Sequence, residues 1–220
     1  MRMNTTWSNK LSSAFNSVLK RTCDILFSVS GLIMVTPVII AVAVMVKLDS
    51  NGPVLYKAER VGRNGKIFYM YKFRSMVVDA DKTGSLISPE NDPRITKAGR
   101  FLRRYELDEL PQLVNVLVGQ MSFVGPRPEV EQYTRQYTEE EKVILTVIPG
   151  MTDYSTIEFI NLSKILARSL DQNKEVLQNI MPRKNRLRVE YALNNSVWID
   201  LNILIQTFKS IVRVKWSTKS

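Results

Sequence analysis

The 220-residue sequence predicts an α+β fold, mostly helical, that is attached to a membrane near its N-terminus. Three observations support this class. An uncharged run covers residues 25–46, two strand-like runs flank an Asn-Gly turn, and apolar residues recur at helical spacing elsewhere. We expect residues 1–48 to form the membrane segment and residues 49–220 to form one globular domain, because no repeat or low-complexity linker divides the latter.

The uncharged run 25–46 is long enough to cross a bilayer, which takes about 20 apolar residues. Thr36-Pro37 lies at its middle. The proline removes a backbone hydrogen bond and the threonine hydroxyl can bond to the carbonyl of Leu32, so we expect a bend there. Basic residues flank both ends of the run, which places both ends on the cytoplasmic side. A re-entrant helix broken at Thr36-Pro37 satisfies both the bend and the flanking charges, and a proline-kinked spanning helix stays open as the alternative.

Amphipathic patterns lie near both termini. The first suits an interfacial helix that continues into the membrane segment, with apolar residues Trp7, Leu11, Phe15, Val18 and Leu19. The second suits a helix lying on the membrane surface and equally a core-packing helix, with apolar residues Trp198, Leu201, Ile205, Phe208 and Val212.

Between these segments, VLYKAERVGRNGKIFYMYKF predicts a small β-hairpin. Its two runs flank Arg63-Asn64-Gly65, and Asn-Gly is a strong signal for a two-residue turn. Residues 79–100 are rich in Gly, Pro and Asp and predict a loop. Residues 101–118 then predict a helix that ends at Gly119, because apolar residues fall at i, i+3, i+4 and i+7 from Leu110.

The composition excludes several kinds of chemistry. The chain has no histidine and a single cysteine, Cys23, so histidine-based triads, His-ligated zinc sites and internal disulfides are absent. A bound metal would be held by oxygen ligands, which favours Mg²⁺ and then Mn²⁺. The net charge of +10 indicates an anionic partner. Nucleic acid is disfavoured because the aromatic residues lie in apolar runs rather than along a basic stripe.

The motif LDELPQL places Asp108 and Glu109 side by side. Asp108 falls at or near the N-cap of the predicted helix, where Pro111 is tolerated, and an acidic first turn by itself only stabilises a helix. However, Arg103 and the Arg127 of VGPRP bring positive charge towards the pair. Such a pair can hold a divalent cation and leave one oxygen free to attack phosphorus. We expect these surroundings to favour the ionised form of Asp108.

Longer motifs make the chain resemble the bacterial sugar transferase family, the small monotopic polyprenyl-phosphate phosphoglycosyl transferases. The matching stretches include YKAERVGRNGKIFYMYKFRSM, LDELPQL with NVLVGQMSFVGPRP, and IPGMT, over roughly residues 19–152. The resemblance implies a monotopic enzyme on the cytoplasmic face of the bacterial inner membrane, anchored by a re-entrant helix broken at Thr36-Pro37. It also implies transfer of a sugar 1-phosphate from a UDP-sugar to undecaprenyl phosphate, which yields a lipid diphosphate sugar and UMP.

By the same resemblance, Asp108 attacks the sugar-side phosphorus and forms a covalent phosphosugar intermediate, while Glu109 and Asp108 hold Mg²⁺. Lys72, Arg103 and Arg127 are the residues expected to contact phosphate. The implied partners are a UDP-sugar, undecaprenyl phosphate and membrane lipid, without nucleic acid. Two alternatives stay open: direct single-step transfer with Asp108 as a base, and a basic membrane-binding module without catalysis.

The resemblance weakens after Thr152. Many relatives continue PGxTG with Leu-Ala-Gln-Val-Asn-Gly-Arg, whereas this chain reads PGMTDYSTIEF. Relatives often carry an aspartate upstream of the last helix, but the matching position holds Arg188, and Glu190 is the nearest acid. The role of this region, the sugar and the glycan pathway are therefore left open. A homo-oligomer is possible, but the sequence does not decide the oligomeric state.

Overall fold

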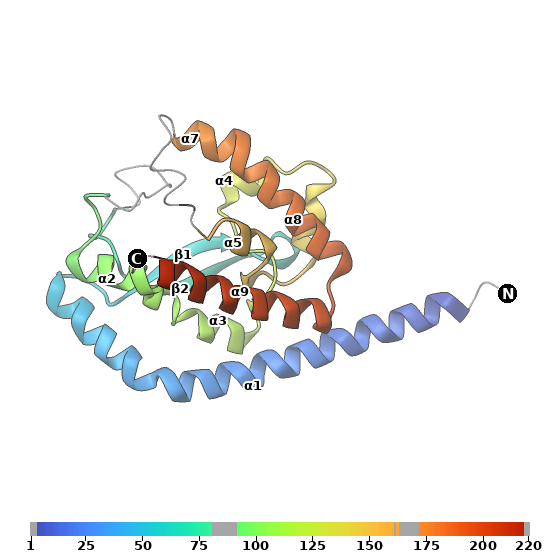
Figure 1. Ribbon diagram of the computed structural model, residues 1–220, viewed down its shortest axis with the longest axis horizontal. Helices are drawn as coiled ribbons and strands as arrows, with labels where there is room; N and C mark the ends of the chain where they lie inside the picture. The colour runs from blue at the N-terminus through green and yellow to red at the C-terminus, as the bar shows by residue number, and fades with distance from the viewer. Residues whose placement is uncertain (1–3, 81–91, 161, 163–171, 218–220) are drawn as a thin grey trace.

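A computed structural model describes residues 4–80, 92–160, 162 and 172–217. Helices dominate this part of the chain, and its strands form two two-stranded sheets (Figure 1). The predicted class, mostly helical with a small hairpin and a long apolar N-terminal helix, is confirmed. Part of the loop predicted at 79–100 lies outside the described residues. The division at residue 48 stays a prediction.

Helix α1 spans Asn4–Asp49 without interruption, so the two N-terminal segments predicted from the sequence form one helix. Its part Asn16–Asp49 is long and apolar enough to cross a membrane, by length and composition. Thr36 Oγ1 donates to the Leu32 carbonyl at 2.6 Å, as expected, and Pro37 lies inside the helix. Figure 1 shows α1 changing direction along its course. The helix thus continues through Thr36-Pro37, where a break was expected, and the re-entrant path of α1 stays a prediction.

Polar contacts fasten α1 to the globular domain at both ends of its apolar run. Near the first end, Arg21 donates to two carbonyls at the end of α3 (Gln112–Val118), at 2.6 and 2.7 Å. In the next turn, Asp24 accepts a hydrogen bond from Ser122 Oγ at 3.1 Å. Just after the other end, Arg74 donates to the Ser50 carbonyl at 2.7 Å. Both ends of the apolar run thus contact one domain.

Strands β1 (Leu55–Val61) and β2 (Ile67–Phe73) pair antiparallel, which confirms the predicted hairpin. Residues 62–66 connect the two strands, so the connection is longer than the predicted two-residue turn. Asn64 and Gly65 have φ angles of 57° and 73°. Glycine and asparagine tolerate this left-handed conformation better than other residues, which explains why the chain reverses there.

The helix predicted for residues 101–118 is divided in two. Helix α2 spans Lys97–Tyr105 and α3 spans Gln112–Val118, and the short 3₁₀ turn η2 (Leu107–Glu109) lies between them. Glu106 has a φ of 57° and ends α2, because a left-handed residue cannot continue a right-handed helix.

This division corrects the position predicted for Asp108. The residue that caps the N-terminus of α3 is Pro111, so Asp108 and Glu109 lie on η2 before the helix begins. The predicted end of the helix is confirmed, since Gly119 caps α3 with a φ of 86°. The acidic pair therefore projects from a tight turn between two helices.

A second sheet, absent from the sequence prediction, carries Arg127. Strands β3 (Ser122–Val124) and β4 (Gly150–Thr152) pair in parallel, and the GPRP segment follows β3. Only glycine fits at residue 150, because a Cβ there would lie 2.1 Å from the Gly125 nitrogen. The short helix α4 (Glu131–Thr134) and the 3₁₀ helix η3 (Glu141–Thr146) precede β4.

The C-terminal part of the described chain is helical. Helix α5 spans Tyr154–Glu158, α7 spans Gln172–Glu175, and a π-helical turn, Val176–Ile180, leads into α8 (Met181–Asn194) and α9 (Val197–Ser217).

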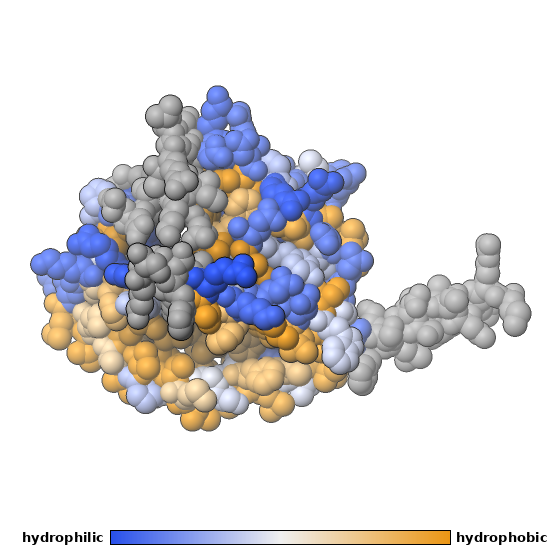
Figure 2. Space-filling model, viewed as in Figure 1, coloured by the Kyte–Doolittle hydropathy of each residue, from blue (hydrophilic) through white to orange (hydrophobic). Residues whose placement is uncertain are grey.

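Helix α9 fits both of the roles predicted for it. Ile203 is fully buried and packs in a cluster with Val124 and Tyr191, whereas Trp198 and Phe208 are 80% and 69% exposed. Figure 2 shows hydrophobic residues gathered on the side of α1, α3 and α9, and hydrophilic residues on the side of α7 and α8. This division suits a membrane on the α1 side.

Candidate active site

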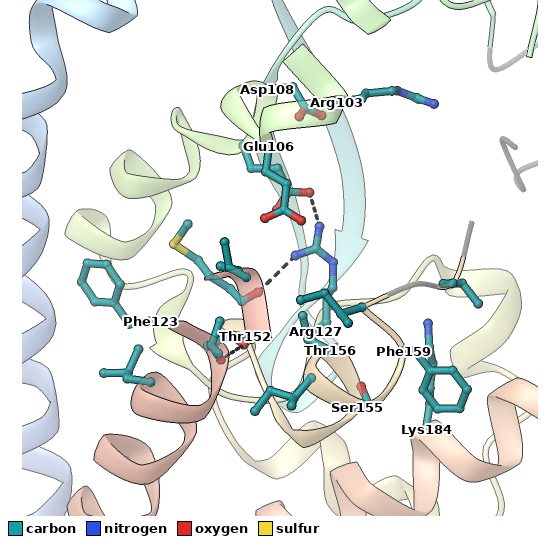
Figure 3. Close-up of a pocket in the computed structure, with 18 of the residues that line it drawn as sticks. Arg103, Glu106, Asp108, Phe123, Arg127, Thr152, Ser155, Thr156, Phe159 and Lys184 are labelled. Atoms are coloured by element: carbon teal, nitrogen blue, oxygen red, sulfur yellow. Dashed lines mark hydrogen bonds and ion pairs between the residues drawn. The ribbon is translucent and has the colours of Figure 1, made fainter. Parts of the chain in front are cut away.

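A cavity of about 560 Å³ lies beside η2 and is also lined by residues of β2, α5, α8 and α9 (Figure 3). All five site residues predicted from the sequence line this cavity: Lys72, Arg103, Asp108, Glu109 and Arg127. They come from four different elements, so the fold brings together residues separated by up to 55 positions. Thr36 and Pro37 lie in α1 and are not part of the lining described here.

Glu109 is held by two cations. Its Oε1 accepts a hydrogen bond from Lys72 Nζ at 2.8 Å and a second, short one from Arg127 Nη2. Burial alone would raise the pKa of Glu109, but Arg127 and Lys72 outweigh burial and hold that pKa well below its ordinary value. Glu109 is therefore a fixed carboxylate with its charge neutralised locally.

Asp108 is buried and differs from its neighbour. In the part of the chain that the structure describes, no lysine or arginine nitrogen lies within 4.0 Å of its carboxylate. Burial raises the pKa of Asp108, and Lys72 and Arg103, which lower it, do not offset burial. The expectation that these surroundings favour the ionised form is therefore wrong for the protein alone. Its carboxylate faces the cavity without an ion-pair partner.

Arg127 is fixed by its backbone as well as by its side chain. Its N–H donates to Asp153 Oδ2 at 3.1 Å, and Nη1 donates to the Met151 carbonyl at 3.2 Å. Arg103 lies on α2, where its Nε donates to Ser75 Oγ at 3.1 Å. Arg127 thus reaches Glu109 directly, whereas the Arg103 side chain extends away from Asp108 in Figure 3.

A second cavity of about 370 Å³ adjoins the first. Lys72, Arg103 and Asp108 line both cavities. Asp108, the nucleophile predicted from the sequence, therefore borders both cavities. The first cavity extends towards α5, α8 and α9, and the second extends towards the hairpin and residues 74–80.

The acidic pair suits a magnesium ion that takes most of its ligands from elsewhere. Among the residues described, no group of three or more His, Cys, Asp or Glu side chains is arranged to hold a metal. Mg²⁺ usually binds one or two carboxylates and completes its shell with water and substrate phosphates. Asp108 carries no ion pair, so its carboxylate oxygens are available to such an ion, and Glu109 is adjacent.

Sequence reasoning assigned no role to the residues at the far end of the cavity. Arg188 is 1% exposed, and its Nη2 and Nε lie 2.8 and 3.4 Å from carboxylate oxygens of Glu129 and Asp153. Asp153 also caps α5 by accepting from the Thr156 N–H at 2.6 Å. The Asp-x-Ser/Thr pattern after PGMT was a signal for this cap. Glu190, by contrast, is exposed and does not line the cavity.

Lys184 also lines the cavity, together with the aromatic ring of Phe159. The lysine lies in the basic run RKNR, and nothing in that run distinguishes a cavity-lining lysine from a solvated one. Its position depends on the packing of α8 against α5, which sequence patterns do not reveal.

The fold and the site define a membrane-associated protein whose carboxylate pair, surrounded by cations, suits anionic substrates. The chain belongs to the bacterial sugar transferase family, whose family model matches residues 15–214.

Named relatives support this membership. The chain is 40% identical over 206 residues to the UDP-glucose:undecaprenyl-phosphate glucose-1-phosphate transferase of Escherichia coli (strain K12), over 91% of this chain and 42% of the relative. It is 36% identical over 220 residues to the undecaprenyl-phosphate galactose phosphotransferase of Salmonella typhimurium, over 93% and 43% of the two chains.

A third relative is the UDP-N-acetylgalactosamine-undecaprenyl-phosphate N-acetylgalactosaminephosphotransferase of Aeromonas hydrophila. The chain is 32% identical to it over 209 residues, which cover 92% of this chain and 45% of the relative. The chain thus spans less than half the length of these three relatives.

Proposed function

We propose that the protein is a phosphoglycosyl transferase that moves a sugar 1-phosphate from a UDP-sugar to undecaprenyl phosphate. The relatives' names point to this donor and acceptor. The products are an undecaprenyl diphosphate sugar and UMP, at an early membrane step of bacterial glycan assembly. The observation that carries the proposal is the buried Asp108 carboxylate, which lines a cavity together with Lys72, Arg103 and Arg127 and has no ion-pair partner of its own among the described residues.

The proposed chemistry has two in-line displacements at one phosphorus atom. Asp108 Oδ attacks the sugar-side phosphorus of the donor, and the bond to the bridging oxygen breaks, so its electron pair leaves with UMP. An oxygen of undecaprenyl phosphate then attacks the same phosphorus and the bond to Asp108 breaks, which regenerates the carboxylate. No proton has to be removed from the acceptor if its phosphate is ionised, so neither step needs a histidine.

The cations have a defined task in both steps. Lys72 and Arg127 are held by Glu109, and Arg103 is held by Ser75, so three positive groups are fixed before the substrate arrives. Fixed charges stabilise the negative charge that gathers on phosphorus more than mobile ones do, because they need no rearrangement. Mg²⁺, held by Asp108 and Glu109 with the donor phosphates, would neutralise further charge there.

We also propose that α1 re-enters the cytoplasmic side instead of crossing the bilayer. Support comes from the contacts at the two ends of its apolar run, where Arg21 donates to a carbonyl of α3 and Arg74 donates to the Ser50 carbonyl just after α1, so both ends meet the same domain. A cysteine introduced beside each end should therefore react with an impermeant reagent from the same side of the membrane. Labelling of the two positions from opposite sides would contradict re-entry.

Two other functions make different predictions. Direct transfer with Asp108 as a general base requires donor and acceptor together before UMP is released. A basic membrane-binding module without catalysis requires no particular carboxylate. A module without catalysis does not account for a carboxylate without an ion pair among three fixed cations, and the order of UMP release separates the covalent from the direct mechanism.

The test is UMP release and protein labelling without the acceptor. Purified protein in nanodiscs, mixed with Mg²⁺ and a UDP-sugar labelled in the sugar-side phosphate, should release about one UMP per active site and retain the label on the polypeptide after rapid quenching. Asp108→Asn should abolish both signals. Turnover without a labelled intermediate would favour the direct mechanism, and near-normal turnover by Asp108→Asn would rule out both mechanisms.

A further inference from the structure

The cavity has a positively charged end that the proposed phosphorus chemistry does not use. We call it the α5–α8 end and define it by Ser155, Thr156, Phe159, Lys184 and Arg188. The three acidic residues that line the cavity all lie within 106–109, at the other end. Figure 3 shows Lys184 on the opposite side of Arg127 from Asp108. The charge on the lining is therefore divided between two ends.

Lys184 is a partly buried cation whose charge is not neutralised locally. Within residues 4–80, 92–160, 162 and 172–217, no carboxylate oxygen lies within 4.0 Å of its Nζ. Its Nζ lies over the ring of Phe159, 5.7 Å from the ring centroid. Burial lowers the pKa of Lys184, because a partly buried ammonium group is hydrated less well than an exposed one. A bound anion would restore the lost interaction.

The nearest carboxylates are engaged elsewhere. Glu129 and Asp153 both pair with the buried Arg188, and Asp153 also accepts from Arg127 and from the first turn of α5. Arg188 Nη1 is buried without a hydrogen-bond partner. Arg188 therefore removes the two carboxylates that could have neutralised Lys184.

The position of the α5–α8 end indicates which part of the donor reaches it. The two phosphorus atoms of a nucleoside diphosphate sugar share one bridging oxygen, so both phosphates must stay close to Asp108 when it attacks. The sugar is attached to the attacked phosphate and can extend past Arg127. A negative charge carried by the sugar is then the group that can meet Lys184.

We propose that the α5–α8 end of the cavity binds a carboxylate on the transferred sugar, so that the donor is a nucleotide-linked hexuronic acid. Lys184 binds the carboxylate directly, and Arg188 is a positioning residue that keeps Glu129 and Asp153 away from the lysine. This inference rests on the proposed function and names the substrate class for the same site.

The experiment compares acidic with neutral donors. The full chain in nanodiscs with undecaprenyl phosphate and Mg²⁺ is given UDP-glucuronic acid, UDP-galacturonic acid, UDP-glucose and UDP-galactose, and UMP release is measured. We expect the highest kcat/KM with an acidic donor. Lys184→Met should lower kcat/KM for that donor at least about tenfold, equivalent to about 1.4 kcal/mol, and change the values for neutral donors less than about twofold.

Two variants control this test. Arg186→Met removes one positive charge from the same helix, but at an exposed position outside the cavity lining, and should leave the donor preference unchanged. Lys184→Arg keeps the charge and should retain the preference for the acidic donor. Thermal unfolding of each variant shows whether the fold is intact.

The possible results separate this inference from the function on which it rests. An equal loss with acidic and neutral donors would assign Lys184 to a phosphate common to all donors and overturn the carboxylate site. Efficient use of neutral donors alone would also overturn it, while supporting the transferase function. Absence of UMP release with every nucleotide sugar would refute the proposed function itself.

Discussion

Replacing Glu109 by glutamine tests whether the two neighbouring carboxylates have different tasks. Glu109 holds Lys72 and Arg127 through its Oε1, and glutamine keeps the shape of the side chain without its charge. The substitution also lowers the pKa of Asp108, because the Glu109 charge is one of the causes that raise it. Asp108 therefore ionises more readily, while the cations that contact phosphate lose their anchor. We expect slower chemistry with the nucleophile still present.

The size of the effect follows from the two contacts of Glu109. A hydrogen bond to a charged group contributes about 1.5–3 kcal/mol, and both contacts change from charged to neutral acceptors. If about 2.7 kcal/mol of transition-state stabilisation is lost, the rate falls roughly 100-fold. Loss of a magnesium ligand would add to this decrease. We therefore expect kcat/KM for Glu109→Gln to fall at least about 100-fold.

The assay follows both UMP release and protein labelling over time. Glu109→Gln should acquire label slowly but reach the level of the unaltered protein, whereas Asp108→Asn should acquire none. Glu106→Gln is the matched control, because Glu106 lines the same cavity and is exposed. It should retain activity within about threefold. Activity of Glu109→Gln within fivefold of the unaltered protein, or an equal loss in Glu106→Gln, would refute this division of tasks.

Two further predictions concern stability and pH. Arg188→Met leaves the buried Asp153 and the half-buried Glu129 without their cation, which should cost about 3–5 kcal/mol and lower the thermal unfolding midpoint by roughly 6–20 °C. An unchanged midpoint would show that the pairs contribute nothing. Burial raises the pKa of Asp108 above 3.8, the pKa of an ordinary aspartate. On acidification, kcat/KM should therefore begin to fall at a higher pH than it would with an ordinary aspartate. Because a cation favours the ionised carboxylate, raising the Mg²⁺ concentration should move this fall to lower pH, and a profile that does not respond to Mg²⁺ would argue against a metal at Asp108.

The sequence predicts the elements whose cause is local. The hairpin follows from Asn64-Gly65, and the end of α3 follows from Gly119. In each case one or two residues have backbone requirements that few other types meet, so a single sequence is enough. The acidic pair and its cations were predicted because they lie in long motifs that resemble those of a known family.

The elements that the sequence did not predict depend on distant contacts. Glu106 adopts a left-handed conformation that glutamate rarely takes, so no pattern announced the break between α2 and α3. Strands β3 and β4 have three residues each, which is too short for a period to be visible. Arginine is usually exposed, and the burial of Arg188 depends on carboxylates 35 and 59 positions away.

The in-line geometry of the proposed reaction explains why one cavity can serve both substrates. Attack by Asp108 expels UMP from the side of phosphorus opposite the carboxylate, and the acceptor must attack from that same side to expel Asp108. The phosphate of the lipid therefore occupies the place that UMP has left. Leu204 and Ile211 of α9 line this cavity, and the outer face of α9 exposes Trp198 and Phe208 on the hydrophobic side of the molecule. A lipid phosphate can thus reach the cavity along α9 while its chain stays on the membrane side, which requires the anchor to hold the site at the bilayer surface rather than above it.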